Sequence, residues 1–189
     1  MKFETFIERA GGLPIIETEN VRHNFSSSNA LEVQMTRWTN QHKLIKLKRC
    51  IYLLSETYRK IIPYEPYLAA VLKKPSYLSL EKSLEYHDLI PEAVGIYTSV
   101  TPKRPGRFST ALGIFDYKHI QVPLFWGYEA VTVNQQTAFI ATPEKALLDF
   151  FYLKPVKPSR DYLEGLRLQN LERLNSGRLR KYAERFGKP

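Results

Sequence analysis

The chain has 189 residues, of which 43% are hydrophobic and 13% aromatic, and its formal net charge is +9. This composition excludes a disordered chain and allows one large or two small hydrophobic cores. The single cysteine, Cys50, excludes an internal disulfide and a multi-cysteine zinc site, and it indicates a reducing cytoplasm. We expect neither a secretory signal nor a membrane-spanning segment, because no apolar run approaches about 18 residues.

The positive charge is concentrated toward the two ends of the chain. Residues 1–60 carry 10 basic and 6 acidic side chains, residues 61–154 carry 9 of each, and residues 155–189 carry 9 and 4. Basic ends are typical of a protein with a polyanionic partner. The alternative explanation is that the charge serves solubility alone.

The first part of the chain predicts two helices. Residues 2–10 can form a short helix that two glycines end, and the serines at 26–28 are N-cap candidates for the next one. From Asn29 to about Gln41, the residues Leu31, Met35 and Trp38 recur at i, i+4 and i+7 and predict a buried stripe. Core packing is therefore a better interpretation of Trp38 than base stacking.

The opposite face of this predicted helix is polar. An arginine can pair with guanine, an asparagine with adenine, and a valine or a threonine methyl group can touch thymine methyl groups. The sequence therefore predicts base contacts in a DNA major groove. The alternative is a polar face that only meets water. The residues of the face are Asn29, Val33, Thr36, Arg37 and Asn40.

A basic hairpin is predicted directly after the helix. Residues 44–48 alternate apolar and basic, which places Leu44, Lys46 and Lys48 on one side, and 51–54 return as an apolar strand after a turn at Arg49 and Cys50. No acid lies between Glu32 and Glu56. We expect this ribbon to contact DNA phosphates and the helix to enter the groove, so residues 1–62 are interpreted as a winged helix-turn-helix domain. The expected phosphate contacts are Lys43, Lys46, Lys48 and Arg49.

The prolines in the segment IIPYEPY at 61–67 indicate a boundary to a second domain at residues 63–189. Strands are expected between 96 and 140, including one over 130–140, and Thr142-Pro143-Glu144 predicts a helix start. The tail from Arg160 to Phe186 is amphipathic and basic. The predicted fold class is α+β: a winged domain, then a mixed α/β domain with a basic helical tail.

A second cluster of cations lies in the segment TPKRPGR at 101–107, between two predicted strands. Lys103, Arg104 and Arg107 could meet a partner's acidic surface or the phosphates of DNA. An ordinary solvated turn is the alternative.

Catalytic patterns are nearly absent. The four histidines are scattered without metal-site spacing, and no glycine loop could cradle a phosphate. We therefore expect no enzyme, no metal and no cofactor. The rival prediction is a metal-dependent enzyme acting on RNA or nucleotides, which would depend on Asp116 and Asp149.

Five segments in order, 29–54, 67–92, 98–120, 140–153 and 163–174, resemble the abortive-infection antitoxins of the AbiEi type. They include NALEVQMTRWTNQHKLIKLKRCIYLL, TSVTPKRPGRFSTALGIFDYKHI and IATPEKALLDFFYL. The family pattern has glycine where this chain has His42, Cys50 and Asp88.

The resemblance implies an antitoxin and repressor of a type IV toxin–antitoxin operon. The N-terminal domain of such a protein binds inverted repeats of double-stranded DNA in its own promoter. The second domain counters a nucleotidyltransferase-like toxin encoded nearby, with no stable complex required, and both act in the cytoplasm. The rival prediction from another class is a protein-interaction adaptor whose winged domain docks a protein partner instead of DNA.

Overall fold

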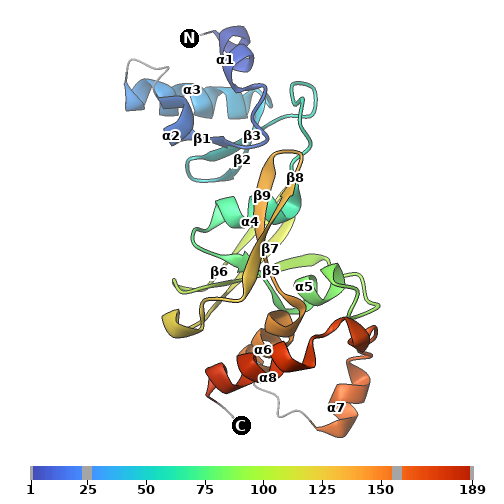
Figure 1. Ribbon diagram of the computed structural model, residues 1–189. Coiled ribbons are helices and arrows are strands. Elements are labelled where there is room, and N and C mark those ends of the chain that lie inside the picture. The colour runs from blue at the N-terminus through green and yellow to red at the C-terminus, as the bar shows by residue number, and fades with distance from the viewer. Residues whose placement is uncertain (1, 23–26, 155–158, 188–189) are drawn as a thin grey trace. The chain divides into compact units, whose positions relative to one another are not determined.

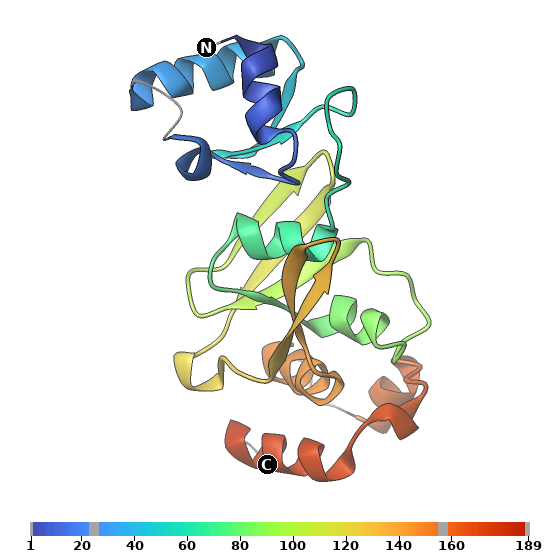
Figure 2. The same ribbon diagram turned by 45° about the horizontal axis from the view of Figure 1, so that its top comes forward.

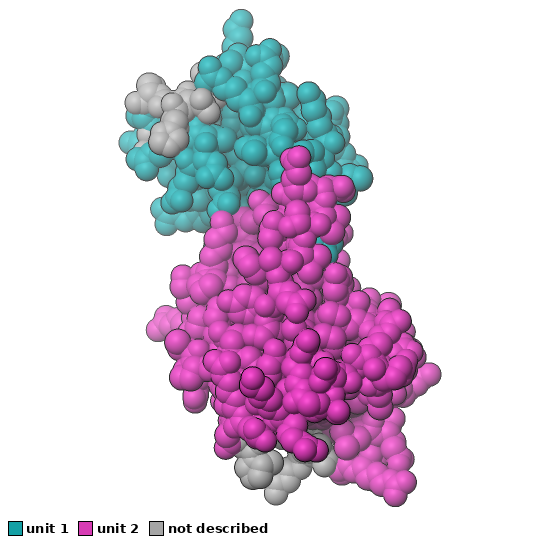
Figure 3. All heavy atoms as spheres, viewed as in Figure 1, with its two compact units in different colours: residues 1–64 teal, residues 65–189 magenta. Residues whose placement is uncertain are grey.

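The chain is an α+β protein that divides into two compact units. The computed structural model describes residues 2–22, 27–154 and 159–187. Unit 1 comprises residues 1–64 and unit 2 residues 65–189 (Figure 3); the boundary expected from the sequence follows residue 62. Each unit has its own sheet and helices (Figure 1). Within the described ranges, no helix combines the length and apolar character that crossing a bilayer requires.

Unit 1 combines short helices with a three-stranded antiparallel sheet of order β1-β3-β2. Ile16 pairs with Tyr52, and Leu44 pairs with Leu54. The elements, in chain order, are α1 (Phe3–Ala10), β1 (Ile16–Glu17), α2 (Thr18–Val21), α3 (Ser28–Asn40), β2 (Leu44–Lys48) and β3 (Ile51–Leu54).

The core of unit 1 confirms the predicted stripe on α3. Leu31, Met35 and Trp38 are all buried, at 2%, 0% and 4% exposed. The Trp38 ring lies 5.2 Å from the ring of Phe3 and 4.7 Å from that of Phe6, both on α1. Burying each such side chain stabilises the fold by roughly 1.5–3 kcal/mol, and the three together fix how α3 is rotated about its axis.

The N-terminus of α3 is capped by Ser27, whose hydroxyl accepts a hydrogen bond from the Ala30 N–H at 3.2 Å. Of the other two predicted candidates, Ser26 lies outside the described residues and Ser28 begins the helix. An oxygen at this position satisfies one of the N–H groups that the first turn leaves without a helical partner.

The C-terminus of α3 ends in a Schellman motif. The Lys43 N–H donates to the Trp38 carbonyl at 2.9 Å, and the His42 N–H donates to the Thr39 carbonyl at 3.0 Å. His42 has a φ of 56°, the left-handed conformation for which glycine is usual at this position. The two hydrogen bonds hold histidine in a conformation that costs a side chain about 1 kcal/mol or more.

The β2–β3 hairpin differs from the prediction at one position. The ladder pairs Lys46 with Tyr52 and Lys48 with Ile51, so Leu47 forms a bulge. The expected strict alternation is wrong because this extra residue breaks the period of two, and Leu44 and Leu47 are both buried. The turn lies at Arg49 and Cys50, as predicted.

Unit 2 is built on a six-stranded mixed sheet of order β6-β7-β5-β4-β9-β8. Pairs β5–β7 and β4–β9 are parallel, and the others are antiparallel. The elements are α4 (Glu65–Leu72), β4 (Tyr77–Leu78), α5 (Leu80–Tyr86), β5 (Ile96–Thr101), β6 (Gly106–Thr110), β7 (Gly113–His119), the 3-10 turn η2 (Val122–Leu124), β8 (Tyr128–Val133), β9 (Gln136–Ala141), α6 (Pro143–Leu153), α7 (Arg160–Gly165), the 3-10 turn η3 (Leu171–Arg173) and α8 (Ser176–Phe186).

Helices cover both faces of this sheet. The Tyr117 hydroxyl of β7 donates to the Ala69 carbonyl of α4 at 2.6 Å, which ties α4 to one face. Tyr77 and Val100 pair across β4 and β5 and belong to the core cluster with Leu84 of α5 and Phe150 of α6. Because neighbouring residues of a strand point to opposite faces, α5 and α6 cover the other face.

One prediction for unit 2 is wrong. The single strand expected over 130–140 is a hairpin, because Asn134 and Gln135 take φ values of 48° and 62° and form a tight turn between β8 and β9. The basic tail is interrupted: α7 and α8 are separated by η3, and Arg167 and Asn170 adopt positive φ. The tail packs on α6, where the Asn175 N–H donates to the buried Glu144 carboxylate at 2.9 Å.

We predict that His42→Gly raises the free energy of unfolding of unit 1 by about 1 kcal/mol, because glycine adopts the left-handed conformation without the side-chain clash. Amide hydrogen exchange of unit 1 peptides measures the change. The matched control is Gln41→Gly, since Gln41 has a φ of −85° and gains nothing from glycine. Faster exchange in both variants would contradict the prediction.

Candidate nucleic-acid interface

The five residues predicted to contact bases lie together on the exposed face of α3. Asn29, Thr36, Arg37 and Asn40 are exposed, and Val33 is 68% exposed. At 3.6 residues per turn, the five fall within an arc of about 100°, opposite the buried stripe. The helix therefore presents one continuous strip of donors, acceptors and small apolar groups.

Two of these side chains have local partners that limit what they can do. The Thr36 hydroxyl donates to the Glu32 carbonyl at 2.9 Å, so its methyl group is the part best placed to contact another molecule. Arg37 lines a shallow hollow of about 280 Å³ together with Glu4 and Lys43. The guanidinium thus lies at the margin of the strip, on the side nearest the N-terminus of α1.

The four residues predicted to contact phosphates are not equivalent. Lys46 and Arg49 are exposed, whereas Lys43 and Lys48 are half-buried. The Lys43 ammonium lies 4.7 Å from the centroid of the Phe3 ring, a cation–π contact that holds the charge near the end of α3. Lys46 and Arg49 are therefore the cations most open to a phosphate backbone.

The hairpin turn has the same backbone feature as the end of α3. Cys50 has a φ of 65°, and its carbonyl accepts a hydrogen bond from the Thr18 N–H at 2.9 Å. This bond anchors the turn to α2. The hairpin is therefore joined to α2 by this hydrogen bond and to β1 by strand pairing. Arg49 lies in the turn that this bond holds.

The loop residues Lys103, Arg104 and Arg107 in unit 2 are also exposed. Lys103 and Arg104 lie in the connection between β5 and β6, whereas Arg107 lies within β6 opposite Asp116 in the ladder. The structure thus divides the predicted cluster: two cations belong to the loop, and the third lies beside a carboxylate on a strand.

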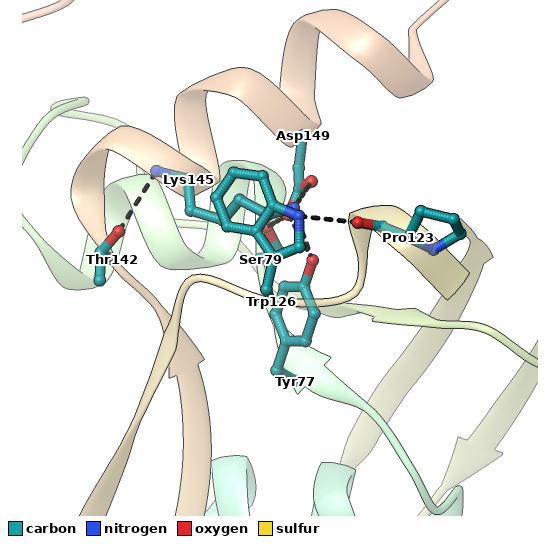
Figure 4. Close-up of polar contacts among 7 residues, drawn as sticks. All are labelled: Tyr77, Ser79, Pro123, Trp126, Thr142, Lys145 and Asp149. Atoms are coloured by element: carbon teal, nitrogen blue, oxygen red, sulfur yellow. Dashed lines mark hydrogen bonds and ion pairs between the residues drawn. The ribbon is translucent and has the colours of Figure 1, made fainter. Parts of the chain in front are cut away.

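The sequence did not predict a buried polar cluster in unit 2, which Figure 4 shows. Lys145 and Asp149 of α6 are fully buried and form an ion pair. The Asp149 carboxylate also accepts hydrogen bonds from the hydroxyls of Tyr77 at 2.9 Å and Ser79 at 2.8 Å. The Lys145 ammonium donates to the Tyr77 hydroxyl at 2.8 Å.

Aromatic rings surround the ammonium of this cluster, and one glycine lies against the aliphatic part of the Lys145 side chain. It lies 5.0 Å from the centroid of the Trp126 ring and 4.8 Å from that of Phe186 on α8. A Cβ atom on Gly127 would come within 2.9 Å of the Lys145 side chain, and Gly127 has a φ of 77°. Glycine is therefore required where the chain enters β8.

Burial dominates the electrostatics of the cluster. Desolvation lowers the pKa of Lys145 and raises the pKa of Asp149, while the attraction between the two charges acts in the opposite direction. Desolvation also raises the pKa of Tyr77, with the neighbouring Asp149 carboxylate adding to the effect. The hydroxyl of Tyr77 stays protonated and donates to the carboxylate, so the cluster joins α6 to β4 and the segment leading into α5.

The rival prediction of an enzyme relied on two aspartates that take different partners. Asp116 pairs with Lys118 at 3.0 Å on β7, whereas Asp149 is enclosed in the buried cluster. Within the described ranges, no three His, Cys, Asp or Glu side chains come together in a way that could hold a metal ion.

Unit 2 also contains a cavity of about 740 Å³ between α5, α6, α7 and the sheet. Its lining is mainly apolar, with Leu84 and Phe150 among the contributing residues. The two lysines of the lining are already paired with carboxylates: Lys118 with Asp116, and Lys154 with Glu81 at 2.6 Å. This cavity therefore offers no excess positive charge to a polyanion.

Comparison with protein-family models found no match, and no curated protein matches the chain.

We predict that Asp149→Ala destabilises unit 2 by about 3–5 kcal/mol, because it leaves the Lys145 ammonium buried without its counter-charge. Urea unfolding followed by Trp126 fluorescence, in a Trp38→Phe background that removes the other tryptophan, measures this loss. The double variant Lys145→Met with Asp149→Leu should recover most of the stability, since it removes both charges. The control, Asp161→Ala on exposed α7, should unfold like the parent chain; equal losses in all three variants would count against the prediction.

Proposed function

We propose that this protein is a DNA-binding repressor and antitoxin of a type IV toxin–antitoxin operon. In this proposal residues 1–62 act as a winged helix-turn-helix domain, with α3 in the major groove and the β2–β3 hairpin beside the phosphates. The domain that follows counters a nucleotidyltransferase-like toxin. The protein acts without catalysis and without a cofactor, in the cytoplasm.

The observation that carries the DNA-binding proposal is the exposed strip on α3. The burial of Leu31, Met35 and Trp38 fixes the rotation of α3. The five residues of the strip then face solvent: Asn29, Val33, Thr36, Arg37 and Asn40. Arginine and asparagine are the side chains that pair two-pronged with guanine and adenine. The exposed Lys46 and Arg49 follow on the hairpin directly after this helix.

The resemblance to AbiEi-type antitoxins gains support from three backbone positions. His42, Cys50 and Asp88, where the family pattern has glycine, have φ values of 56°, 65° and 56°. Asp88 ends α5 with the same two hydrogen bonds as His42 ends α3: its N–H donates to Glu85, and that of Leu89 donates to Leu84. Glycine is the residue that these conformations favour, so the family pattern and this backbone agree in both units.

The experiment is a gel-shift titration of the full chain on the DNA upstream of its own reading frame. We predict that Arg37→Ala weakens binding to that DNA by about 5- to 150-fold if Arg37 pairs with a guanine, and leaves binding to scrambled duplex unchanged. An equal loss on both duplexes would show that Arg37 contacts only the backbone.

Lys46→Ala is the matched companion of this variant. A phosphate contact carries no sequence information, so this change should weaken both duplexes alike and lower the slope of log K against log salt by about 0.9. Lys60→Ala, an exposed lysine outside the strip and the hairpin, should alter neither. If the parent chain leaves its upstream DNA unshifted at physiological salt, the protein is the adaptor of the rival prediction.

The antitoxin part is tested by co-expression with the neighbouring nucleotidyltransferase-like reading frame. The chain should restore growth when that product arrests it. We predict that Arg37→Ala still restores growth while losing repression of a promoter reporter, because the variant changes only the strip on α3. Loss of both activities together would mean that protection from the toxin acts through DNA binding, and no restoration by the parent chain would refute the antitoxin proposal.

A further inference from the structure

Unit 2 has an aromatic pocket between α4, the segment 74–76 and the β8–β9 hairpin. Its volume is about 380 Å³, within the size range of small-ligand sites. Figures 1 and 2 both show α4 beside the hairpin, and both elements contribute residues to the lining of the pocket. We name it by the four rings among its lining residues, which are Tyr67, Phe125, Tyr128 and Phe139.

The rings of the pocket are supported from behind. Tyr128 stacks on the buried Tyr77 at 4.7 Å, and its ring lies 5.3 Å from that of Phe125. Phe139 meets Tyr128 edge to face at 5.8 Å and remains 40% exposed. A flat apolar ligand would therefore meet pre-arranged rings, and little side-chain freedom would be lost on binding.

Cations lie beside the pocket on two connected loops. Lys74 lines the pocket itself. The Pro75 carbonyl accepts a hydrogen bond from the Thr101 hydroxyl at 2.7 Å, and the Thr101 oxygen accepts one from the Lys103 N–H at 3.2 Å. Two consecutive hydrogen bonds through the Thr101 hydroxyl thus connect the loop that carries Lys103 and Arg104 to Pro75, which lines the pocket.

The loop that carries Lys103 and Arg104 contains no acid. The segments 73–78 and 101–110 contain no Asp or Glu, and among the described residues neither Lys103 nor Arg104 forms an ion pair. Seven of the nine acids in residues 61–154 form ion pairs, whereas Glu65 on α4 and Glu129 on β8 are in no ion pair among the described residues. Ion pairs join Glu81 to Lys154, Glu85 to Lys82, Asp88 to Arg173, Glu92 to Arg167, Asp116 to Lys118, Glu144 to Arg178 and Asp149 to Lys145.

A ligand that fits this site has a flat apolar part and negative charge next to it. An acidic peptide supplies negative charge but need not contain an aromatic ring. A cationic ligand would be repelled by Lys74, which lines the pocket. In a duplex each base is already stacked on its neighbours, so only an unpaired nucleotide can place the face of its base on an aromatic side chain while its phosphate meets a cation.

We propose that the aromatic pocket binds an unpaired base of single-stranded RNA or DNA, with the adjoining phosphates held by Lys103 and Arg104. The site lies wholly in unit 2 and does not depend on the duplex-reading role proposed for unit 1. It gives the second unit a nucleic-acid contact of a different kind.

Fluorescence anisotropy at physiological salt tests this proposal with labelled 12-nucleotide single strands of RNA and of DNA, and with a duplex of the same sequence. We predict that Phe139→Ala weakens single-strand binding by about five-fold or more and leaves the duplex unaffected. Phe139→Leu keeps the apolar bulk and removes the ring, so it should show the same loss without a change in melting temperature. Tyr86→Ala, an exposed aromatic on α5, is the matched control.

The cations have a separate readout. The double variant Lys103→Ala with Arg104→Ala should lower the salt slope of single-strand binding by about 0.7 for each phosphate that is no longer neutralised, whereas Lys46→Ala in unit 1 should leave it unchanged. The RNA and DNA arms show which strand is preferred, and binding of either supports the site.

Three outcomes would overturn the proposal. They are no single-strand binding by the parent chain, parent-like binding by Phe139→Leu, and equal competition by poly-glutamate, which would identify a surface for acidic proteins. Lys46 and Arg37 are intact in all the unit 2 variants. A loss of single-strand binding therefore does not change the gel-shift result on upstream DNA, and a negative gel shift does not exclude single-strand binding by unit 2.

Discussion

The packing of Trp38 against Phe3 and Phe6 is the contact on which the exposure of the polar strip on α3 depends. A helix is a rigid cylinder, so fixing one stripe of it also fixes the opposite face. The stripe consists of Leu31, Met35 and Trp38, and it is buried in the same core as Phe3 and Phe6. The polar strip is exposed as a consequence of this packing.

Three residues other than glycine, His42, Cys50 and Asp88, hold the left-handed conformation at turns. A non-glycine residue persists at positive φ only when its surroundings over-determine the conformation. At His42 and Asp88 two Schellman hydrogen bonds do so, and at Cys50 the carbonyl is held by the Thr18 N–H. At these three turns the chain thus adopts, without glycine, the backbone geometry that a glycine would adopt freely.

Local signals explain which parts of the structure the sequence could predict. The period of Leu31, Met35 and Trp38, the serine cap and the start of α6 at Thr142-Pro143 depend on residues a few positions apart, and all three appear as expected. The bulge at Leu47 was missed because alternation over five residues carries no mark of an inserted one. The hairpin at Asn134 and Gln135 was missed because an apolar run on both sides hides a two-residue turn without glycine.

The buried cluster shows what sequence reasoning lacked in unit 2. Its members Tyr77 and Ser79 lie about 70 positions before Asp149, so no local pattern joins them. One signal was available: Lys145 and Asp149 stand four apart in an otherwise apolar helix, the spacing at which opposite charges meet on one face. A helix this apolar has little exposed surface, so such a pair is expected to be buried and to need further hydrogen bonds.

The net charge of the middle segment did not predict the exposed cations Lys103 and Arg104 of the β5–β6 loop. Residues 61–154 carry equal numbers of acids and bases, which indicates no preference for a polyanion. In the folded chain seven of those nine acids are held in ion pairs, and among the described residues Lys103 and Arg104 form none, so their positive charge is retained beside the aromatic pocket. Since charges separated by more than a Debye length of about 8 Å are largely screened in physiological salt, the local balance decides what these loops bind, and a net charge of zero over the segment does not oppose it.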